Sequence, residues 1–361
     1  MELNAEIVYY WMSLASMSVT RQNKLVDITG GVLPLWQNFY KNSSIKNYLG
    51  DKFDLLSRFR DCKYLQDKME LYASSGIILI SIEHQKYPEK LKHIHEPPNL
   101  LFCKGNLELL AKNCVAVVGT RHCTRYGQTV TKRISCDFVD CGVTVVSGLA
   151  TGIDSYAHSA VLEYNGHTIA VLASGFDNIA PTSNINLAKE IATRGLLLSE
   201  YAPHLVAKPF MFVARNRIVA GLSDGIVVVE AGLTSGAKIT ANLGLEQGKT
   251  VYCIPGPVNS PQSIGTNSFI KEGATLVTDG FEVCLDLGFA KIKQKNFKPN
   301  VNQLDFFEQN IYDLLLQGVT VFDDLVVALC CQARELSSIL TSMEIRGIVV
   351  KNPGNVYSIA N

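Results

Sequence analysis

The sequence predicts an α/β protein with a Rossmann-like, doubly wound and mainly parallel sheet, a small helical module before it and a winged-helix module after it. In the middle of the chain, short apolar runs without polar alternation are separated by helical patterns, which is typical of parallel strands covered on both faces. The N-terminal segment has helical spacing and few strand signals, and the tail ends in a hairpin pattern. These observations predict the fold class.

The composition is that of a globular protein with a sizeable core. The 361 residues suggest two or three domains, and 47% of them are hydrophobic while 18% are charged. No apolar run reaches the roughly 18 residues that span a bilayer. Glu2 and Glu6, with no lysine or arginine, precede the apolar stretch 7–19, which argues against a signal peptide. We therefore expect a cytoplasmic protein without a membrane segment.

Cysteine usage and net charge restrict the function classes further. Ten cysteines occur singly, apart from Cys330 and Cys331, with no CxxC pair and no zinc-site spacing, so we interpret them as free thiols in a reducing compartment. The formal net charge is zero, with 33 basic and 33 acidic residues. Any binding of a phosphate chain must therefore come from a local patch.

Residues 1–72 are expected to form the helical module, because Ile7, Trp11 and Leu14 recur at helical spacing. We interpret Trp11 and Trp36 as part of its core rather than as a stacking platform. Residues 73–288 are expected to form the sheet domain. Its predicted strands are 77–80, 115–118, 143–146, 168–173, 196–198, 226–229, 250–254 and 274–277.

Four loops of this domain each follow a predicted strand. In open sheets of this kind, ligands bind beyond the carboxyl ends of the strands. The loops at Gly119, Ser147, Gly175 and Ala231 are therefore expected to gather at one edge, and Arg121 is expected to face the same rim as Arg215 and Arg217.

The stretch 208–241 is the most informative one. Arg215 and Arg217 open a predicted short helix over 218–222, and after the next strand the loop 231–236 opens a second helix. Such a loop presents free backbone N–H groups and the positive end of a helix dipole, and arginine can hold phosphate oxygens with two parallel hydrogen bonds. The pattern predicts an anion site for a sugar-phosphate chain. The alternative is that both arginines are ordinary surface charges.

Three segments resemble known functional motifs, but their spacing or the residues around them do not fit those motifs. The segment 244–250, GLEQGKT, has the wrong spacing for a P-loop and ends a helix instead of opening one. Gly119-Thr120-Arg121 lacks the later glycines of a dinucleotide fingerprint. His93 and His95 have no third metal ligand nearby, and we interpret them as solvated or capping residues.

We interpret four acid or base groups as structural, namely Asp154, His158, Glu200 and Glu230. Asp154 is expected to cap a helix or to interact favourably with its dipole, and a pair with His158 four residues later would be structural. Glu200 and Glu230 end strands and could act as acid/base groups. With no partner identifiable, we interpret both as structural hydrogen-bond acceptors.

Residues 289–302 carry four lysines and are expected to form a linker, and residues 303–361 are expected to form the winged-helix module. Three helical patterns, 311–316, 322–329 and 336–345, precede a hairpin pattern over 348–359. The third helix carries acidic as well as basic residues. This favours a protein-contact or structural role over DNA recognition.

The order of motifs resembles that of the DNA-processing protein A family, also called DprA or Smf. The resemblance covers roughly residues 75–285 and rests on the segments Tyr87-Pro88, Pro97-Pro98, 104–106 (KGN), 118–121 (VGTR), 147–154 (SGLATGID), 215–223 (RNRIVAGLS), 228–231 (VVEA), Ser235-Gly236 and 254–257 (IPGP). The chain departs from the family pattern at Ile179-Ala180-Pro181 and at Phe212-Val213.

The resemblance implies a bacterial protein that binds single-stranded DNA without sequence specificity and helps load the RecA recombinase onto it during DNA uptake, natural transformation and recombination. It also implies a homodimer through the Rossmann-like domain, and neither a metal nor a nucleotide cofactor. The implied DNA-binding set is Gly119, Thr120, Arg121, Ser147, Gly148, Lys208, Phe212, Arg215, Asn216, Arg217, Ser235 and Lys238. The alternative function is a nucleotide-processing enzyme, similar to a nucleoside phosphate hydrolase, with Glu230 as the acid.

Overall fold

A computed structural model describes residues 3–15, 17–289, 304–346, 348–352 and 354–359. The chain separates into two compact units, Met1–Lys291 and Ile292–Asn361, and each is described by itself. The predicted linker 289–302 lies, apart from Phe289, outside the described residues. The boundaries at 72, 288 and 302 stay predictions.

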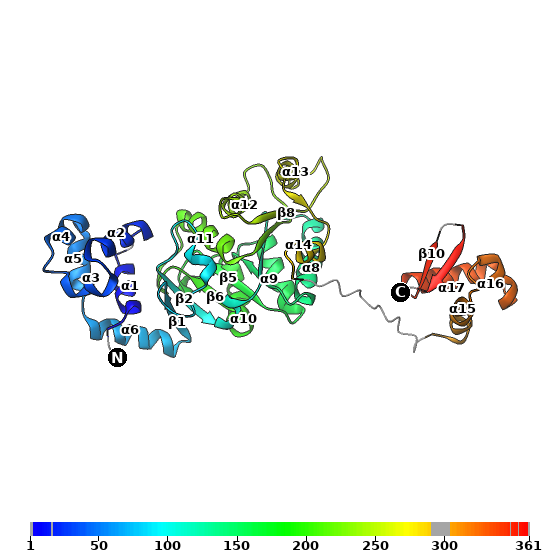
Figure 1. The fold of residues 1–361 in the computed structure, drawn as a ribbon, viewed down its shortest axis with the longest axis horizontal. Coiled ribbons are helices and arrows are strands. Elements are labelled where there is room, and N and C mark those ends of the chain that lie inside the picture. The colour runs from blue at the N-terminus through cyan, green and yellow to red at the C-terminus, as the bar shows by residue number, and fades with distance from the viewer. Residues whose placement is uncertain (1–2, 16, 290–303, 347, 353, 360–361) are drawn as a thin grey trace. The chain divides into compact units, whose positions relative to one another are not determined.

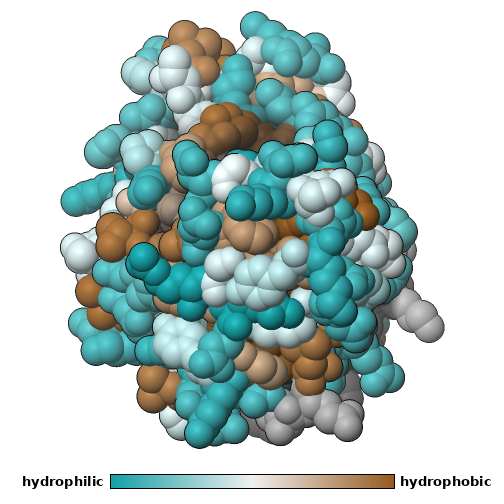
Figure 2. Space-filling view, turned by 90° about the vertical axis from the view of Figure 1, so that its left-hand side faces the viewer, coloured by the Kyte–Doolittle hydropathy of each residue, from teal (hydrophilic) through white to brown (hydrophobic). Residues whose placement is uncertain are grey.

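The first unit begins with six helices, drawn in blue in Figure 1. They are α1 (Ala5–Ser13), α2 (Val19–Thr29), α3 (Val32–Asn38), α4 (Ser43–Leu49), α5 (Lys52–Arg58) and α6 (Cys62–Ser74). Trp11 and Trp36 are buried and meet edge to face, with ring centroids 5.1 Å apart, so their interpretation as core residues is confirmed. The face that carries these helices is mainly hydrophilic, with scattered hydrophobic patches (Figure 2).

The helical core continues into the sheet. One buried cluster joins residues of α1 to α6 with Ile77 and Leu79 of the first strand and with Leu100 and Phe102 of the second. The helices therefore pack on the edge of the sheet within a shared core, rather than around a core of their own.

The described residues of this unit contain a nine-stranded sheet in the order β1-β2-β6-β5-β4-β3-β7-β8-β9. The strands are β1 (Ile77–Ser81), β2 (Leu100–Gly105), β3 (Cys114–Val118), β4 (Thr144–Ser147), β5 (Thr168–Leu172), β6 (Leu196–Ser199), β7 (Gly225–Val228), β8 (Thr250–Cys253) and β9 (Thr275–Leu276). From β6 to β9 all neighbours are parallel, while β1 and β2 join antiparallel at one edge. β2, which follows Pro97 and Pro98, is not among the strands predicted from the sequence.

Helices cover both faces of this sheet (Figure 1). They are α7 (Glu89–Lys92), α8 (Arg125–Asp140), α9 (Ile153–Glu163), α10 (Ile185–Arg194), α11 (Pro209–Leu222), α12 (Gly236–Glu246), α13 (Ile264–Lys271) and α14 (Gly280–Asp286). Successive residues of β3 enter opposite cores: Ala116 packs with α11 and α12, whereas Val115 and Val117 pack with α8, α9 and α14. The predicted doubly wound fold is confirmed.

The chain order places a switch point between β3 and β7. From β3 the chain proceeds through β4, β5 and β6 on one side, and then returns to β7 on the other side. The loops that leave the carboxyl ends of β3 and β7 therefore diverge in direction, and a crevice opens between them.

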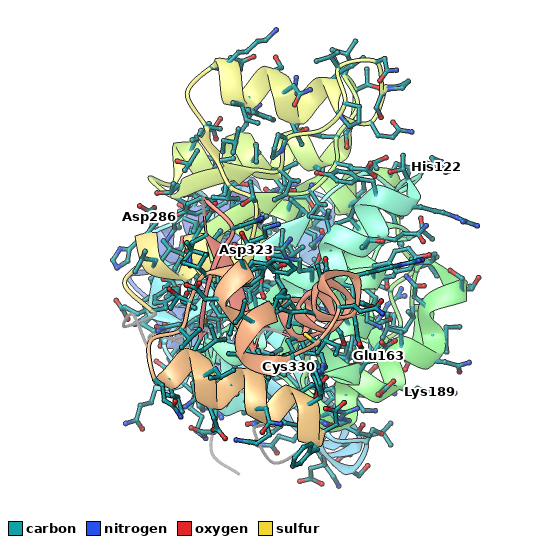
Figure 3. The ribbon with its side chains drawn as sticks, turned by 90° about the vertical axis from the view of Figure 1, so that its right-hand side faces the viewer. His122, Glu163, Lys189, Asp286, Asp323 and Cys330 are labelled. Atoms are coloured by element: carbon teal, nitrogen blue, oxygen red, sulfur yellow. The ribbon has the colours of Figure 1, made fainter. Side chains whose placement is uncertain are left out.

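The second unit contains α15 (Phe306–Leu316), α16 (Phe322–Leu329), α17 (Ala333–Ile345) and the antiparallel pair β10 (Val349–Asn352) and β11 (Val356–Ile359). Asp305 and Glu308 form a capping box at the start of α15. Asp323 lies in the first turn of α16, and Cys330 ends that helix (Figure 3). The predicted three helices and hairpin of a winged helix are confirmed.

No single helix in the described part of the chain is long and apolar enough to cross a membrane, and α16 with α17 reaches that length and composition only as a pair bent by 113°.

Candidate nucleic-acid interface

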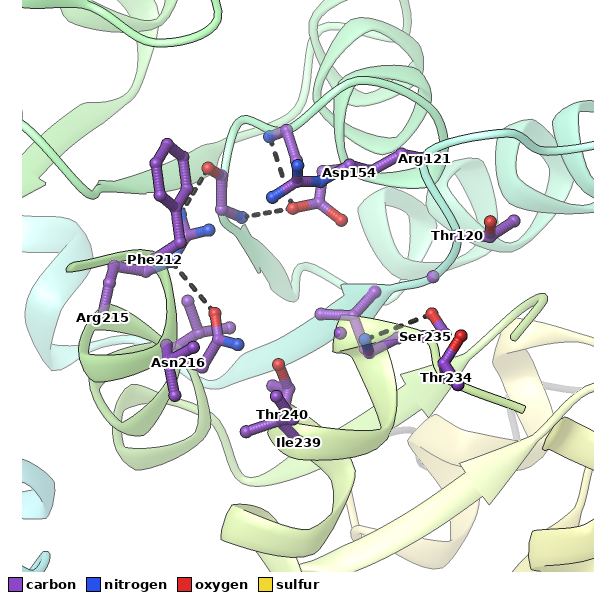
Figure 4. A pocket seen from close by; sticks show the side chains of 18 of the residues that line it. Thr120, Arg121, Asp154, Phe212, Arg215, Asn216, Thr234, Ser235, Ile239 and Thr240 are labelled. Carbon is purple, nitrogen blue, oxygen red and sulfur yellow. Dashed lines mark hydrogen bonds between the residues drawn. The ribbon is translucent and has the colours of Figure 1, made fainter. Parts of the chain in front are cut away.

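A pocket of about 360 Å³ lies at the switch point of the sheet. Its lining comes from the loop after β3, the loop after β4, the middle of α11 and the start of α12. Figure 4 shows the side chains around it, among them Thr120, Arg121, Phe212, Arg215, Asn216, Thr234, Ser235, Ile239 and Thr240. Three strand-end loops that are far apart in the sequence thus meet at one site.

Backbone contacts fix the loop after β3. The N–H of Thr120 donates to the carbonyl of Glu230 at 2.8 Å, and the carbonyl of Thr120 accepts from the N–H of Ile153 at 3.3 Å. A Cβ atom on Gly119 would overlap the side chain of Ile153, so this position requires glycine. The loop is therefore joined to the segment that follows β7 and to the start of α9.

Arg121 and Phe212 form the cationic and aromatic part of the pocket. Arg121 is exposed, and its guanidinium carbon lies 5.5 Å from the centroid of the Phe212 ring. A cation at this distance from a ring face is attracted by the ring's quadrupole. One arginine and one aromatic ring are thus presented together to the solvent.

The opposite wall is the N-terminus of α12, an eleven-residue helix. Ser235 caps it, and its hydroxyl accepts from the N–H of Ala237 at 3.3 Å. The first turn of a helix carries a partial positive charge and N–H groups without intrahelical partners, which favours an anion there. The pocket therefore has a positive end at α12 as well as at Arg121.

The position of Arg215 and Arg217 in α11 corrects the sequence prediction. The helix begins at Pro209, with Lys208 as its N-cap, so both arginines lie in its interior. Residues two apart on a helix are about 200° apart around its axis. Consequently Arg215 points into the pocket wall, whereas Arg217 points away and donates to Glu200 at 2.6 and 2.8 Å.

Comparisons with known proteins show the family to which this chain belongs. The model of the family described as DNA recombination-mediator protein A matches residues 78–288. The chain belongs to this family. The DprA winged helix domain matches residues 297–355, and the resemblance inferred from the motifs is confirmed.

DprA relatives cover most of the chain. The DNA processing protein DprA of Bacillus subtilis is 34% identical over 78% of this chain and 89% of its own length, and that of Streptococcus pneumoniae is 43% identical over 67% and 87%. The X-ray structure of the Streptococcus pneumoniae protein has a TM-score of 0.68 at 33% identity and covers 79% of this chain and 99% of that one. A Helicobacter pylori DprA structure, described as giving insights into a unique single-stranded DNA binding mode, has a TM-score of 0.54 at 31% identity and covers 58% and 95%.

Of the twelve expected site residues of this DprA-family chain, eight line the pocket. They are Gly119, Thr120, Arg121, Gly148, Phe212, Arg215, Asn216 and Ser235. The structure brings them together from four segments of the chain, as the strand order predicts. Whether each contacts DNA stays a prediction.

The other four lie elsewhere. Ser147 is fully buried, and its hydroxyl donates to the carbonyl of Val117 at 2.7 Å. Lys208 is exposed at the start of α11. Arg217 is paired with Glu200, and the Lys238 amine lies 5.4 Å from the Phe269 ring centroid. These four residues are close in sequence to residues that line the pocket, but their own side chains do not line it.

The sequence missed Asp154 as a residue of this pocket. Its carboxylate does not cap α9; it accepts from the N–H groups of Gly148 and Ala150 at 3.1 and 3.4 Å. Thr234 and Thr240 also line the pocket without having been singled out. Thr234 lies within the predicted loop 231–236, and Thr240 lies four residues after Gly236, about one helical turn into the helix that this loop opens. These positions are the signal that could have identified them.

His158 does not pair with Asp154, so that possibility is wrong. Thr168 donates its hydroxyl hydrogen to the carbonyl of Val145, and the 2.6 Å contact between Thr168 and His158 Nδ1 therefore makes Nδ1 the donor. Nε2 is buried without a partner among the described residues. Burial, and then the charge of Arg215, lowers the pKa of His158 to about 3.

This low pKa predicts acid sensitivity. Below pH about 6.5 the unfolded chain protonates this histidine while the folded chain does not, so stability falls by up to about 1.4 kcal/mol per pH unit towards the folded pKa. Urea unfolding measures the free energy of unfolding at pH 7 and at pH 5.5. Between these two pH values the wild type should lose about 1 kcal/mol more of this free energy than a His158→Gln variant. Equal pH dependence in the two proteins would refute a neutral buried His158.

The two strand-ending glutamates are structural acceptors, as the sequence predicts. Glu230 is buried, and its carboxylate accepts from the N–H and hydroxyl of Thr124 at 2.8 and 2.6 Å. It does not line the pocket, so it is not placed to act as the acid of a nucleotide-processing enzyme. The described residues contain no group of three or more His, Cys, Asp or Glu side chains that could hold a metal.

Proposed function

We propose that this chain binds single-stranded DNA in the pocket at the switch point, without sequence selection, and helps load a RecA recombinase onto the strand during natural transformation and recombination. The observation that carries the proposal is the meeting of Arg121, Phe212 and the N-terminus of α12 around one opening. The single-stranded DNA binding described for the Helicobacter pylori relative supports it.

The chemistry of the pocket fits a single strand. Phosphate oxygens are recognised by an arginine fork and by helix N-terminal N–H groups, which are both present. A base can stack on Phe212, and such stacking contributes about 1–3 kcal/mol per base whatever the base is. Stacking and phosphate contacts are insensitive to sequence, so the site is expected to accept any unpaired strand.

Fluorescence anisotropy with matched single- and double-stranded oligonucleotides tests the proposal. With about 1.5 positive charges per pocket, one from Arg121 and about half from the α12 N-terminus, the affinity for a single strand should fall roughly fourfold between about 50 and 200 mM salt. The duplex should bind more weakly, because its bases are stacked and cannot reach Phe212. Equal affinity for both oligonucleotides would contradict a stacking site.

Two partner proposals belong to this function. Loading is tested by RecA assembly on a strand covered with single-strand-binding protein, which this chain should accelerate. A homodimer through the first unit is supported by exposed apolar side chains on β9 and on the two helices that pack on β8, namely Leu276, Leu245 of α12 and Ile264 of α13. Pairing two pockets would raise the avidity for one strand without new contacts.

The second unit is proposed to contact protein rather than DNA. Its third helix, α17, places Glu335 and Glu344 on the same element as Arg334 and Arg346. One of these arginines, Arg346, is already paired with Glu308. A helix of this charge pattern offers little attraction to a phosphate backbone.

A further inference from the structure

We propose that Arg215 and Asp154 act as a buried positioning pair that shapes the DNA pocket, and that Arg215 itself binds no phosphate. This inference rests on the proposed function, because it concerns the same site. It gives the two arginines different roles: Arg121 contacts the strand, and Arg215 holds the loop beneath it. Among the described residues, the arginines that line the pocket are Arg121 and Arg215. They differ in exposure, in partners and in what surrounds them.

The Nη1 and Nε donors of Arg215 are turned towards acceptors of the protein. It is 5% exposed, and Nη1 donates to the carbonyls of Gly148 and Val171 while Nε donates to Asn216 Oδ1 at 3.2 Å. Nη1 and Nε together reach three acceptors from fixed positions in one planar guanidinium, which is a geometry that arginine provides and lysine does not. The side chain thereby ties α11 to the ends of β4 and β5.

Asp154 holds the same loop from the other side. Its carboxylate accepts from the N–H of Gly148, whose carbonyl is the one that Arg215 binds. Gly148 is therefore fixed at both of its backbone polar groups. A Cβ atom there would overlap the guanidinium of Arg215, so the loop and the arginine fit together only around glycine.

The loop between these anchors has an unfavourable backbone. Leu149 is buried with φ +56°, a conformation that non-glycine residues rarely adopt. The Asn184 side chain donates to the carbonyls of Leu149 and Ala150 at 2.9 and 3.2 Å. A strained turn persists where its surroundings fix it, and Arg215, Asp154 and Asn184 supply that fixation here.

Arg215 and Asp154 also make one backbone position unavailable to a phosphate. The N–H groups of Gly148 and Ala150, just before α9, are already used by the Asp154 carboxylate. These two N–H groups are therefore not free to bind a phosphate at this helix start. Burial raises the pKa of Asp154 and the neighbouring charge of Arg215 opposes that shift, so the two side chains interact with each other. The groups left for a strand are Arg121 and the N-terminus of α12.

The shape of the loop reaches Arg121 through the backbone. Gly152, at the end of the loop, lies against the backbone of Thr120 and Arg121 so closely that a Cβ atom would overlap it. The next residue, Ile153, donates its N–H to the carbonyl of Thr120. Releasing Gly148 would therefore displace the segment that carries the phosphate-binding arginine.

The first test compares lysine and glutamine at both arginines by single-strand binding across a salt series. We expect Arg215→Lys and Arg215→Gln to bind equally weakly, at least tenfold below the wild type, with an unchanged salt slope. Arg121→Lys should keep most of the affinity, and Arg121→Gln should lower the slope by about 0.7. Rescue by Arg215→Lys, or a slope lowered by about 0.7 in Arg215→Gln, would overturn the inference.

The second test needs no variant. Phenylglyoxal modifies accessible arginines, and peptide mass spectrometry locates the modified sites in free and DNA-bound wild-type protein. Arg215 should stay unmodified in both states, while Arg121 should react when free and be protected by a single strand. Modification of Arg215 that the strand prevents would overturn the inference. A wild-type chain that binds no single strand would instead refute the proposed function and leave the buried pair intact.

Discussion

Replacing Arg217 by alanine is expected to lower the stability of the first unit by about 3–5 kcal/mol, because the change leaves a buried carboxylate without its partner. Arg217 is 9% exposed and makes two hydrogen bonds to Glu200. Burial already raises the pKa of Glu200, and Arg217 opposes that shift. A melting temperature reduced by roughly 10 °C is the expected measurement.

A double variant provides the control for this prediction. Replacing Arg217 by methionine and Glu200 by leucine together should restore most of the lost stability, because no unpaired charge is then buried. Residual single-strand binding in the folded fraction of Arg217→Ala should be near that of the wild type. A stable Arg217→Ala protein that has lost DNA binding would show that Arg217 is a direct DNA contact, as the sequence suggested.

Replacing Arg121 by alanine should weaken DNA binding and leave stability unchanged, which is the opposite of the effect expected for Arg217→Ala. The side chain is exposed, so the melting temperature should not change, while the loss of a charged phosphate contact is expected to weaken single-strand binding by about 1.5–3 kcal/mol, or roughly 10- to 150-fold. The Phe212 ring would also lose the cation 5.5 Å from its centroid. Anisotropy titration at constant salt measures the change.

Arg125 is a matched control for Arg121. It is an exposed arginine in the first turn of α8, four residues further along the chain, and it does not line the pocket. Arg125→Ala removes the same charge from the same region and should reduce affinity only slightly. Equal losses in Arg121→Ala and Arg125→Ala would mean that general charge, not this pocket, attracts the strand.

The sheet was largely predictable from the sequence because its central strands are buried on both faces. Runs such as 115–118 and 226–229 contain no polar residue, and this pattern has few structural alternatives. The convergence of the loops after β3, β4 and β7 then followed from the chain order of a parallel sheet. β2 was missed because an antiparallel edge strand after Pro97 and Pro98 has no such context.

The orientation of side chains was not predictable to the same degree. Arg215-Asn216-Arg217 suggested a polar helix start, although Pro209 is itself a helix-start signal. With the helix placed correctly, Arg215 and Arg217 fall on different sides. Asp154 could have been assigned either to its own helix or to the loop before it, and only the three-dimensional path of 148–154 decides between them.

The central claim is that a single strand lies in the pocket against Phe212. A photo-crosslinking amino acid, p-benzoylphenylalanine, placed at Phe212 keeps an aromatic ring there, and the same residue placed at Leu71, an exposed position on α6, provides the control. Irradiation with a labelled single-stranded oligonucleotide should give a covalent adduct at position 212 and none at position 71. An adduct at position 71 with none at 212, in proteins that still bind the oligonucleotide, would place the strand elsewhere.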